Sequence, residues 1–211
     1  TQNIKFKDGD SSNFILHAET TDKLVIFATN GRFYTIACEK LPSGRGQGQP
    51  LRLMIDLENG HEVLDMFIFQ KNKRLIVVSD AGRGFIVNAE DIFAQTRNGK
   101  QVLNLKQNNK ATFIHHIKDG HDHVAVIGTK RKLLIFKLDE LPTMSRGQGV
   151  ILQRYSSGIF SDLTSFKLSQ GLSWSVKASI RSEMELSSWI GKRAQTGTLA
   201  FKKFPKSNKF K

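Results

Sequence analysis

The stretch "LPSGRGQGQPL" at residues 41–51 returns in altered form as "LPTMSRGQGVIL" at residues 141–152. The two copies share Arg-Gly-Gln-Gly, which begins at Arg45 in the first and at Arg146 in the second, 101 residues apart (146 − 45). Ile92 stands midway, in the position that leucine occupies before each of these loops. This spacing indicates a repeat of about 50 residues, so the two loops are two repeats apart.

Each repeat contains four short runs of β-branched and aromatic residues separated by turns, which is the pattern of β-strands. The first runs lie at residues 24–29, 75–80 and 124–129, the second at 33–38, 85–90 and 133–138, the third at 52–57, 101–105 and 150–155, and the fourth at 63–69, 112–117 and 163–168. A glycine loop precedes each third run, and the middle repeat has the variant "RNGK" at 97–100. Residues 13–19 are predicted to be the fourth strand of an earlier repeat. Residues 172–204 form a degenerate fourth repeat without a fourth strand, with Gly197 in its glycine loop.

Four-stranded units at this period predict an all-β, propeller-like fold, because one blade cannot bury its own face and must pack against the next. The prediction is a single domain over residues 1–204 with about four blade repeats. A basic tail at 205–211 follows it.

The composition points to a polyanionic partner. The net charge is +13 and the isoelectric point is about 10.0, values typical of proteins that bind nucleic acid, acidic membranes or acidic proteins. The only cysteine, Cys38, excludes an internal disulfide and fits a reducing compartment. No apolar run is long enough for a membrane span, and the first residues do not form a signal peptide.

Basic side chains recur at equivalent positions in successive repeats. One set lies in the turn between the first and second strands, and another lies in or beside the glycine loop. The turn set is Arg32, Arg83, Lys130, Arg131 and Lys132, and the loop set is Arg45, Arg97, Lys100, Arg146, Lys192 and Arg193. On a radial fold this placement predicts a basic ribbon around the rim, which suits a long charged polymer. Glycines in the loop would let the backbone approach phosphate groups closely.

Plainer interpretations exist for each of these positions. Glycine loops between strands are often only turns, and residues 129–132 fit a solvated hairpin tip equally well. Aromatic and basic residues do not interleave as in proteins that bind single strands, and most phenylalanines alternate within predicted strands and belong to the core. Contacts with the backbone of duplex DNA are therefore favoured over base reading.

The sequence offers no recognisable catalytic or metal site. "GRGQGQP" lacks the Gly-Lys-Ser/Thr of a nucleotide-binding loop. "HHIKDGHDH" at 115–123 contains metal-ligand side chains, but its first two histidines should face opposite sides of a strand, and "DG" at 119–120 predicts a hairpin turn. Tyr34 and Tyr155 lie in predicted strands, and neither paired carboxylates nor a catalytic triad is evident.

Several segments together resemble the C-terminal domains of bacterial topoisomerase IV A subunits and, more distantly, of gyrase A. They are "FKDGD" (6–10), "LPSGRGQGQPL" (41–51), "VSDAGRGFIV" (78–87), the third repeat's "DELP…RGQG" (139–149) and "GKRAQTGTL" (191–199). The resemblance covers about residues 4–204. It implies a β-pinwheel, in which neighbouring blades exchange strands, and the family's blade loops correspond by position to Arg45, Arg97, Lys100 and Arg146.

The resemblance also implies a function. The domain would bind and bend duplex DNA, and so guide the choice of DNA segment for decatenation and supercoil relaxation. The chain alone would not be an enzyme and would need no cofactor. The catalytic tyrosine and the magnesium site would lie in the N-terminal part of the A subunit, and ATP hydrolysis would belong to the B subunit. Both of these parts would be partners, in the bacterial cytoplasm and at the nucleoid.

Two alternatives remain. Gyrase A domains wrap DNA through a box with consecutive arginines and a lysine. The closest match here, at residues 43–48, has one arginine and no lysine, which favours topoisomerase IV. The other alternative is a propeller scaffold that binds acidic proteins.

Overall fold

The computed structural model describes residues 12–44 and 48–211. Within these residues the chain forms fourteen β-strands and six short 3-10 helices, and no α-helix. The 3-10 helices are η1 (Cys38–Lys40), η2 (Leu51–Leu53), η3 (Ala89–Ile92), η4 (Leu138–Glu140), η5 (Leu168–Gln170) and η6 (Ser187–Trp189). None of the helices in this part of the chain has the length and apolar character needed to cross a membrane.

The strands form three four-stranded antiparallel sheets and one two-stranded sheet. The first sheet contains β3 (Val63–Ile68), β1 (Lys23–Ala28), β2 (Arg32–Ala37) and β6 (Lys100–Gln101), in that spatial order. The second contains β10 (Val150–Ile151), β5 (Arg83–Asn88), β4 (Arg74–Ser79) and β7 (Ala111–Ile117). The third contains β11 (Phe160–Phe166), β8 (His123–Gly128), β9 (Lys132–Lys137) and β14 (Thr198–Leu199), and the fourth contains β12 (Leu172–Val176) and β13 (Ser179–Glu183).

Neighbouring sheets exchange strands, which confirms the expected pinwheel. β6 comes from the second repeat but pairs with β2 of the first sheet. In the same way β10 pairs with β5, and β14 pairs with β9. Each of these exchanged strands has only two residues. The first, second and fourth strands of the first three repeats lie close to their predicted positions.

The central strands are apolar on both faces because each sheet packs between two others. Leu75 and Val77 of β4 pack against the first sheet, in a cluster with Phe27 of β1. Their neighbours Ile76 and Val78 face the other way, into a cluster shared with β8 of the third sheet. All four side chains of β4 are almost completely buried. Such stacking explains near-continuous apolar runs where a one-sided sheet would show alternation.

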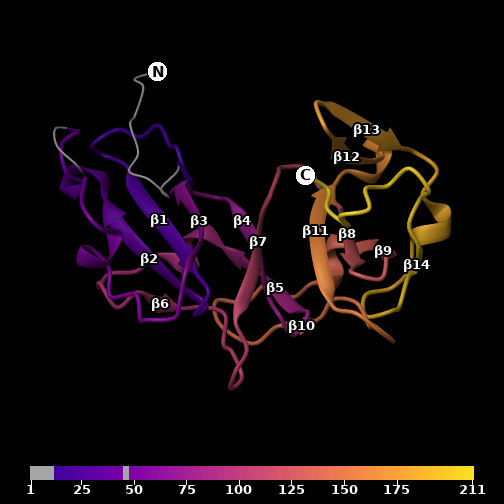
Figure 1. Ribbon diagram of the computed structural model, residues 1–211, viewed down its shortest axis with the longest axis horizontal. Helices are drawn as coiled ribbons and strands as arrows, with labels where there is room; N and C mark the ends of the chain where they lie inside the picture. The colour runs from indigo at the N-terminus through magenta and orange to yellow at the C-terminus, as the bar shows by residue number, and fades with distance from the viewer. Residues whose placement is uncertain (1–11, 45–47) are drawn as a thin grey trace.

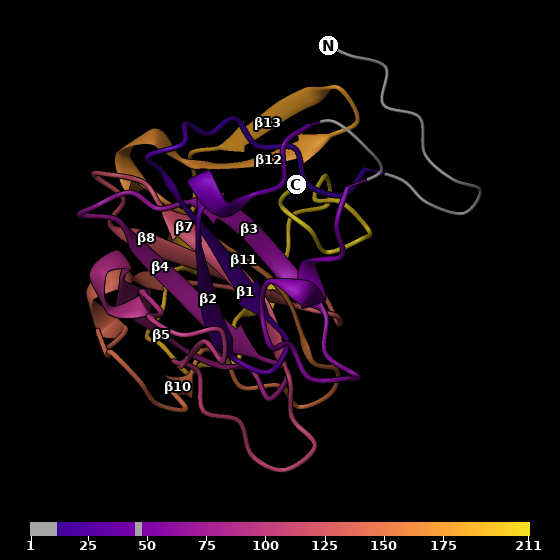
Figure 2. The same cartoon turned by 90° about the vertical axis from the view of Figure 1, so that its left-hand side faces the viewer.

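The sheets follow one another across the molecule, from the first on the left of Figure 1 to the third on the right, with β12 and β13 above it. Figure 2 looks along this row and shows the strands of successive sheets behind one another. The fourth strands, β3, β7 and β11, are neighbours across the sheets. The exchanged strands pair at the opposite edge of each sheet.

A glycine with positive φ introduces each exchanged strand. Gly99, Gly149 and Gly197 have φ of 70°, 76° and 76°. At Gly99 a Cβ would lie 2.7 Å from the carbonyl oxygen of Phe33, and at the other two positions it would overlap a carbonyl of the receiving strand. Only glycine combines this φ with such a close approach between backbones.

Two strand predictions were wrong. Residues 52–57 contain no strand, and the 3-10 helix η2 covers the start of this segment. A third strand needs the second strand of the preceding repeat as a partner, and the described residues contain no such strand before β1. Residues 13–19 also form no strand. A local pattern of side chains cannot show whether a partner is present.

The turn at residues 119–120 exists, with Gly120 at a φ of 80°, but it does not close a hairpin. It connects β7 of the second sheet to β8 of the third, and these two strands do not pair. The predicted hairpin was therefore wrong, and the segment is a connection between blades.

Candidate nucleic-acid interface

Two of the predicted turn residues hold the glycine loop of the following repeat. Arg32 donates from Nη1 to the carbonyl oxygen of Asn98 at 3.1 Å. Arg83 donates from Nε and Nη2 to the carbonyl oxygen of Gly149 at 3.2 and 2.9 Å. Both side chains are half-buried. These contacts fix the loop immediately before the exchanged strand, so part of the donor capacity of each guanidinium is used within the fold.

Arg131 makes the equivalent contact in the third sheet, with a segment beyond the exchanged strand. Its Nη1 donates to the carbonyl oxygen of Pro205 at 2.9 Å, and its Nη2 donates to those of Phe201 and Phe204, both at 3.2 Å. The guanidinium is half-buried. We refer to Arg32, Arg83 and Arg131 as the turn arginines.

Arg193, in the loop of the fourth repeat, is also engaged in contacts between repeats. Its backbone N–H donates to Glu140 Oε2 at 2.8 Å, and its Nε donates to the Glu140 carbonyl at 3.0 Å. Nη1 donates to the carbonyl oxygen of Ile151 in β10 at 2.7 Å. This half-buried arginine therefore connects the exchanged strand of the second sheet to the third blade.

The remaining predicted residues are more open to solvent. Lys132, at the start of β9, is half-buried. Five side chains, which we call the exposed cations, are exposed: Arg97, Lys100, Lys130, Arg146 and Lys192. Arg45 lies outside the described residues, so its predicted role stays a prediction.

Two exposed cations have partners within the protein. Arg97 donates from Nη2 to the Leu53 carbonyl at 2.8 Å and lies 3.4 Å from Asp56 Oδ1. Arg146 donates from Nε to Asn104 Oδ1 at 3.0 Å. An ion pair this open to solvent stabilises the fold by less than about 1 kcal/mol, so a stronger anion can displace it.

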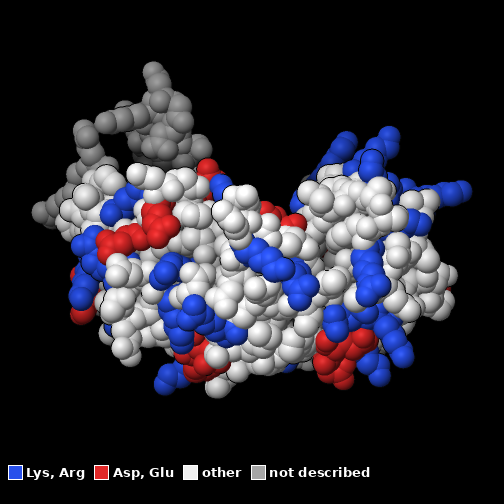
Figure 3. Space-filling view, turned by 90° about the horizontal axis from the view of Figure 1, so that it is seen from below, with Lys and Arg blue, Asp and Glu red and all other residues white. Residues whose placement is uncertain are grey.

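Figure 3 shows one long face of the molecule, with Lys and Arg side chains along its whole length. Small groups of Asp and Glu interrupt them, so the basic surface is a series of patches. Because charges are screened over about 8 Å at physiological salt, each patch acts on the nearest phosphates. A long polyanion can contact several patches in turn.

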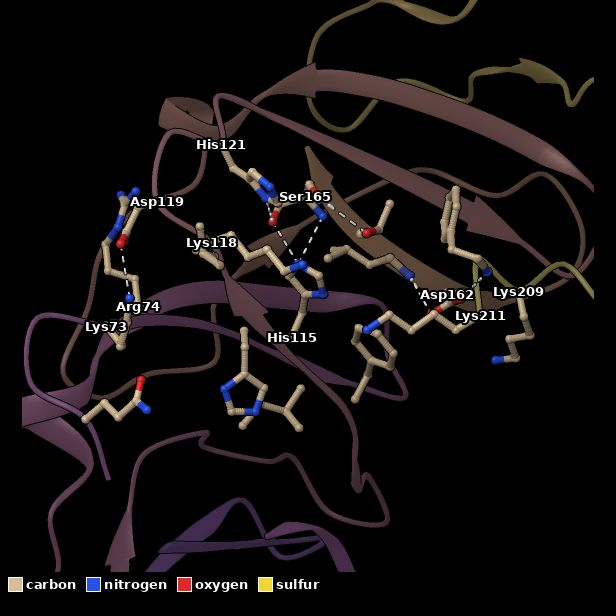
Figure 4. Close-up of a pocket in the computed structure, with 18 residues that line it drawn as sticks. Lys73, Arg74, His115, Lys118, Asp119, His121, Asp162, Ser165, Lys209 and Lys211 are labelled. Atoms are coloured by element: carbon tan, nitrogen blue, oxygen red, sulfur yellow. Dashed lines mark hydrogen bonds and ion pairs between the residues drawn. The ribbon is translucent and has the colours of Figure 1, made fainter. Parts of the chain in front are cut away.

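The histidine segment connects the fourth strands of neighbouring sheets. His116 Nε2 lies 2.7 Å from Asp65 Oδ2 on β3. His115 faces the other way, as strand alternation predicts, with Nε2 2.7 Å from Ser165 Oγ on β11. His121 Nδ1 lies 2.7 Å from the same hydroxyl (Figure 4). The histidines therefore hold the blades together at this edge.

The protonation state of His115 fits this structural role. The Ser165 backbone N–H donates to His115 Nε2 at 3.1 Å, so this nitrogen is an acceptor and the proton sits on Nδ1. Burial first, and then the nearby charge of Lys211, lower the pKa of His115 to about 3. Three potential metal ligands do not cluster anywhere in residues 12–44 or 48–211.

The potential nucleophiles lie in the core. Cys38 is buried and free, and burial raises the pKa of its thiol. Burial also raises the pKa of the Tyr155 phenol, and Tyr34 is fully buried. These environments stabilise the protonated, unreactive forms of the thiol and of the Tyr155 phenol.

Sequence reasoning missed one feature, an aromatic pocket beside β13. It is lined by Trp174, Trp189 and Phe201, together with Arg181, Lys202 and Lys203. The only signal in the sequence was "FKK" at 201–203, since the two tryptophans come from separate segments.

The exchanged strands, the row of blades and the repeated basic positions define a DNA-binding β-pinwheel as the class of protein. The family model described as "DNA gyrase C-terminal domain, beta-propeller" matches residues 22–70, 73–117 and 122–167. The chain belongs to this family.

Curated relatives and solved structures agree with this assignment. The DNA topoisomerase 4 A protein of Caulobacter vibrioides is 42% identical over 99% of this chain, and that of Rickettsia bellii is 38% identical over 98%. The chain spans only 27% and 28% of the length of these two relatives. The structure of the E. coli ParC C-terminal domain matches 97% of this chain and 86% of its own, with 27% identity and a TM-score of 0.82. A DNA gyrase A C-terminal domain has 19% identity, covers 94% of this chain and 70% of its own, and shares the fold with a TM-score of 0.62.

Proposed function

We propose that this chain binds and bends duplex DNA as the C-terminal domain of a topoisomerase IV A subunit. One observation carries the proposal: basic side chains recur at equivalent places in successive blades of a domain whose relatives are topoisomerase 4 A subunits. The exposed cations supply charges that phosphates can reach, and the turn arginines keep the loops that bear Arg97, Lys100 and Arg146 in place.

Bending follows from the arrangement of the charges. DNA that contacts the patches of successive blades must follow the surface of the row of sheets. Bending a site of 20–30 base pairs by 40–90° costs on the order of 1–6 kcal/mol, so several phosphate contacts are needed to offset it. Such contacts carry no sequence information, and binding should depend little on base sequence.

The parent protein would be an ATP-dependent type II topoisomerase. This domain would guide the choice of DNA segment for decatenation and supercoil relaxation. Strand cleavage by a tyrosine with Mg²⁺ would belong to the N-terminal part of the A subunit, and ATP hydrolysis to the B subunit. The domain itself would need no cofactor and would act at the nucleoid in the bacterial cytoplasm.

The family match also leaves gyrase-like wrapping as a second candidate. Sealing a nicked circle with the domain bound distinguishes the two. Wrapping changes the linking number, whereas simple bending leaves it unchanged. We expect no change.

The test of the interface is charge reversal at exposed positions. We expect Lys130→Glu, Arg146→Glu and Lys192→Glu, combined in one variant, to weaken binding of a duplex of about 40 base pairs by at least about tenfold. Fluorescence anisotropy of the labelled duplex measures the affinity. Lys71→Glu is a matched control, because Lys71 is exposed but lies at the end of its sheet opposite the β4–β5 turn.

Unchanged affinity in the triple variant would contradict the proposed interface. If the wild-type chain bound an acidic protein and DNA did not compete, the scaffold hypothesis would replace the proposal.

A further inference from the structure

The aromatic pocket beside β13 is separate from the exposed cations. It has a volume of about 800 Å³ and lies between β13 and the segment that follows β14. Its walls are Trp174, Trp189, Phe201, Arg181, Lys202 and Lys203, together with Glu183. Pockets of roughly 300–1,000 Å³ accommodate small molecules or single groups of a larger ligand.

The aromatic rings are packed against one another. The ring of Phe201 stacks on Trp174, with centroids 5.3 Å apart and planes 12° apart, and lies 4.1 Å from the ring of Trp189. Trp189 is fixed further by its Nε1, which donates to the Leu199 carbonyl at 2.9 Å. Phe201 and Trp189 are only half-buried. The pocket thus offers ordered aromatic surface to a ligand.

The incomplete fourth blade explains why this surface is uncovered. The first three sheets have four strands each, while β12 and β13 form a sheet of two. Trp174 is only 4% exposed, and its Nε1 has no hydrogen-bond partner within the described part of the chain. A buried indole N–H without a partner is unfavourable, so the packing here is not that of a completed core.

Cations surround the rings. Arg181, Lys202 and Lys203 are all exposed, and Glu183 is the one acidic residue in the lining. Glu183 already accepts hydrogen bonds from the backbone N–H groups of Met184 and Glu185. Its carboxylate is therefore held next to its own strand, and the charge available to a ligand is positive.

Aromatic faces beside cations match the chemistry of an unpaired nucleotide, in which the base stacks and the phosphate is neutralised. We infer that this pocket binds an unpaired nucleotide of a DNA strand, as at a nick, gap or end. A paired base cannot reach the rings because both of its faces are stacked within the duplex. The inference rests on the proposed function only in that DNA is the partner, and it adds a second mode of binding.

The tryptophans make the test direct, since the chain's only two both line the pocket. A single-stranded thymidine pentamer is titrated into the full chain while intrinsic tryptophan fluorescence is recorded. We expect saturable quenching. Trp189→Leu should weaken pentamer binding at least about fivefold, the loss expected for one stacking contact, with Trp174 still reporting.

Surface variants guard against a loss of folding in Trp189→Leu. Lys202→Glu with Lys203→Glu should weaken pentamer binding about tenfold or more. Lys206→Glu is the control, because this exposed lysine is nearby in sequence but does not line the pocket. Affinity for a closed hairpin duplex, which has no free ends, should change less than twofold or so in the double variant.

Three results would overturn the inference. The first is the absence of quenching by the pentamer while the duplex still binds, which leaves the proposed function intact. The second is an equal loss of pentamer binding in Lys206→Glu, which would indicate general charge attraction. The third is an equal loss of pentamer and hairpin binding in the double variant, which would mean one shared site. If neither DNA binds, the proposed function fails as well.

Discussion

The turn arginines and the exposed cations carry the same charge, but the structure uses them differently. Arg32, Arg83 and Arg131 are half-buried, and each donates to carbonyl oxygens of the next repeat. The exposed cations project from the surface with few partners. The contrast indicates that one set mainly stabilises the exchange of strands between blades, while the other is free to meet DNA.

The glycine at the exchanged strand should show the largest effect. Gly149→Ala places a Cβ against the backbone of Gly84 at a φ of 76°, and we expect it to lower the free energy of unfolding by on the order of 3 kcal/mol. Gly48 has nearly the same φ, 77°, but no described atom within 4 Å of an added Cβ. Gly48→Ala should cost only about 1 kcal/mol. Urea unfolding measures both, and equal losses would mean that the exchanged strand contributes little.

The turn arginines should come next. Arg83→Ala removes two hydrogen bonds from a charged donor to the Gly149 carbonyl, and we expect a loss of about 2 kcal/mol in unfolding free energy. Arg83→Lys keeps the charge but not the paired donors, and it should recover less than half of this loss. Lys130→Glu should stay within about 0.5 kcal/mol of the wild type. If Arg83→Ala were as stable as the wild type but bound DNA weakly, Arg83 would belong with the exposed cations.

His115 should add a smaller, pH-dependent term between blades. Its folded pKa of about 3 lies below the ordinary value of 6.5, so the unfolded chain binds a proton first as the pH falls. The contribution of His115 is therefore fully present above pH 6.5 and is lost as the pH falls toward 3. Between pH 6.5 and 5 the wild type should lose about 1–2 kcal/mol more than His115→Asn. Urea unfolding at the two pH values measures this difference, and parallel losses would show that the histidine is not neutral in the fold.

Single exposed cations should show the smallest effects. We expect Lys130→Glu or Lys192→Glu alone to weaken duplex binding only a few-fold, since each meets about one phosphate. Each should also reduce the slope of log affinity against log salt by about 0.9. Anisotropy titrations at several salt concentrations measure both quantities. A lower affinity with an unchanged slope would point to altered structure rather than to a lost phosphate contact.

Much of the fold could be predicted because the information is local and repeated. Apolar runs such as 24–29 and 75–80 form strands close to the predicted bounds, and recurrence every 50 residues indicated blades. The segment at 52–57 was mispredicted because its state depends on a receiving strand, which the pattern of its own side chains cannot show. The exchange between blades came from the resemblance, not from the pattern.

The roles of the basic residues were harder to predict. Arg83 and its acceptor Gly149 are 66 residues apart, and nothing local distinguishes Arg83 from Arg146. The aromatic pocket was missed because Trp174 and Phe201 occur in short apolar segments that resemble core strands. Only the incomplete fourth sheet leaves their surroundings open, and this property belongs to the whole fold.

The most direct test of the central claim is a titration of the wild-type chain against a duplex of about 40 base pairs across a range of salt concentrations. If the five exposed cations each neutralise a phosphate, log affinity should fall with log salt with a slope of about −4, and with little dependence on base sequence. The absence of binding at low salt, or an affinity that does not change with salt, would contradict the account.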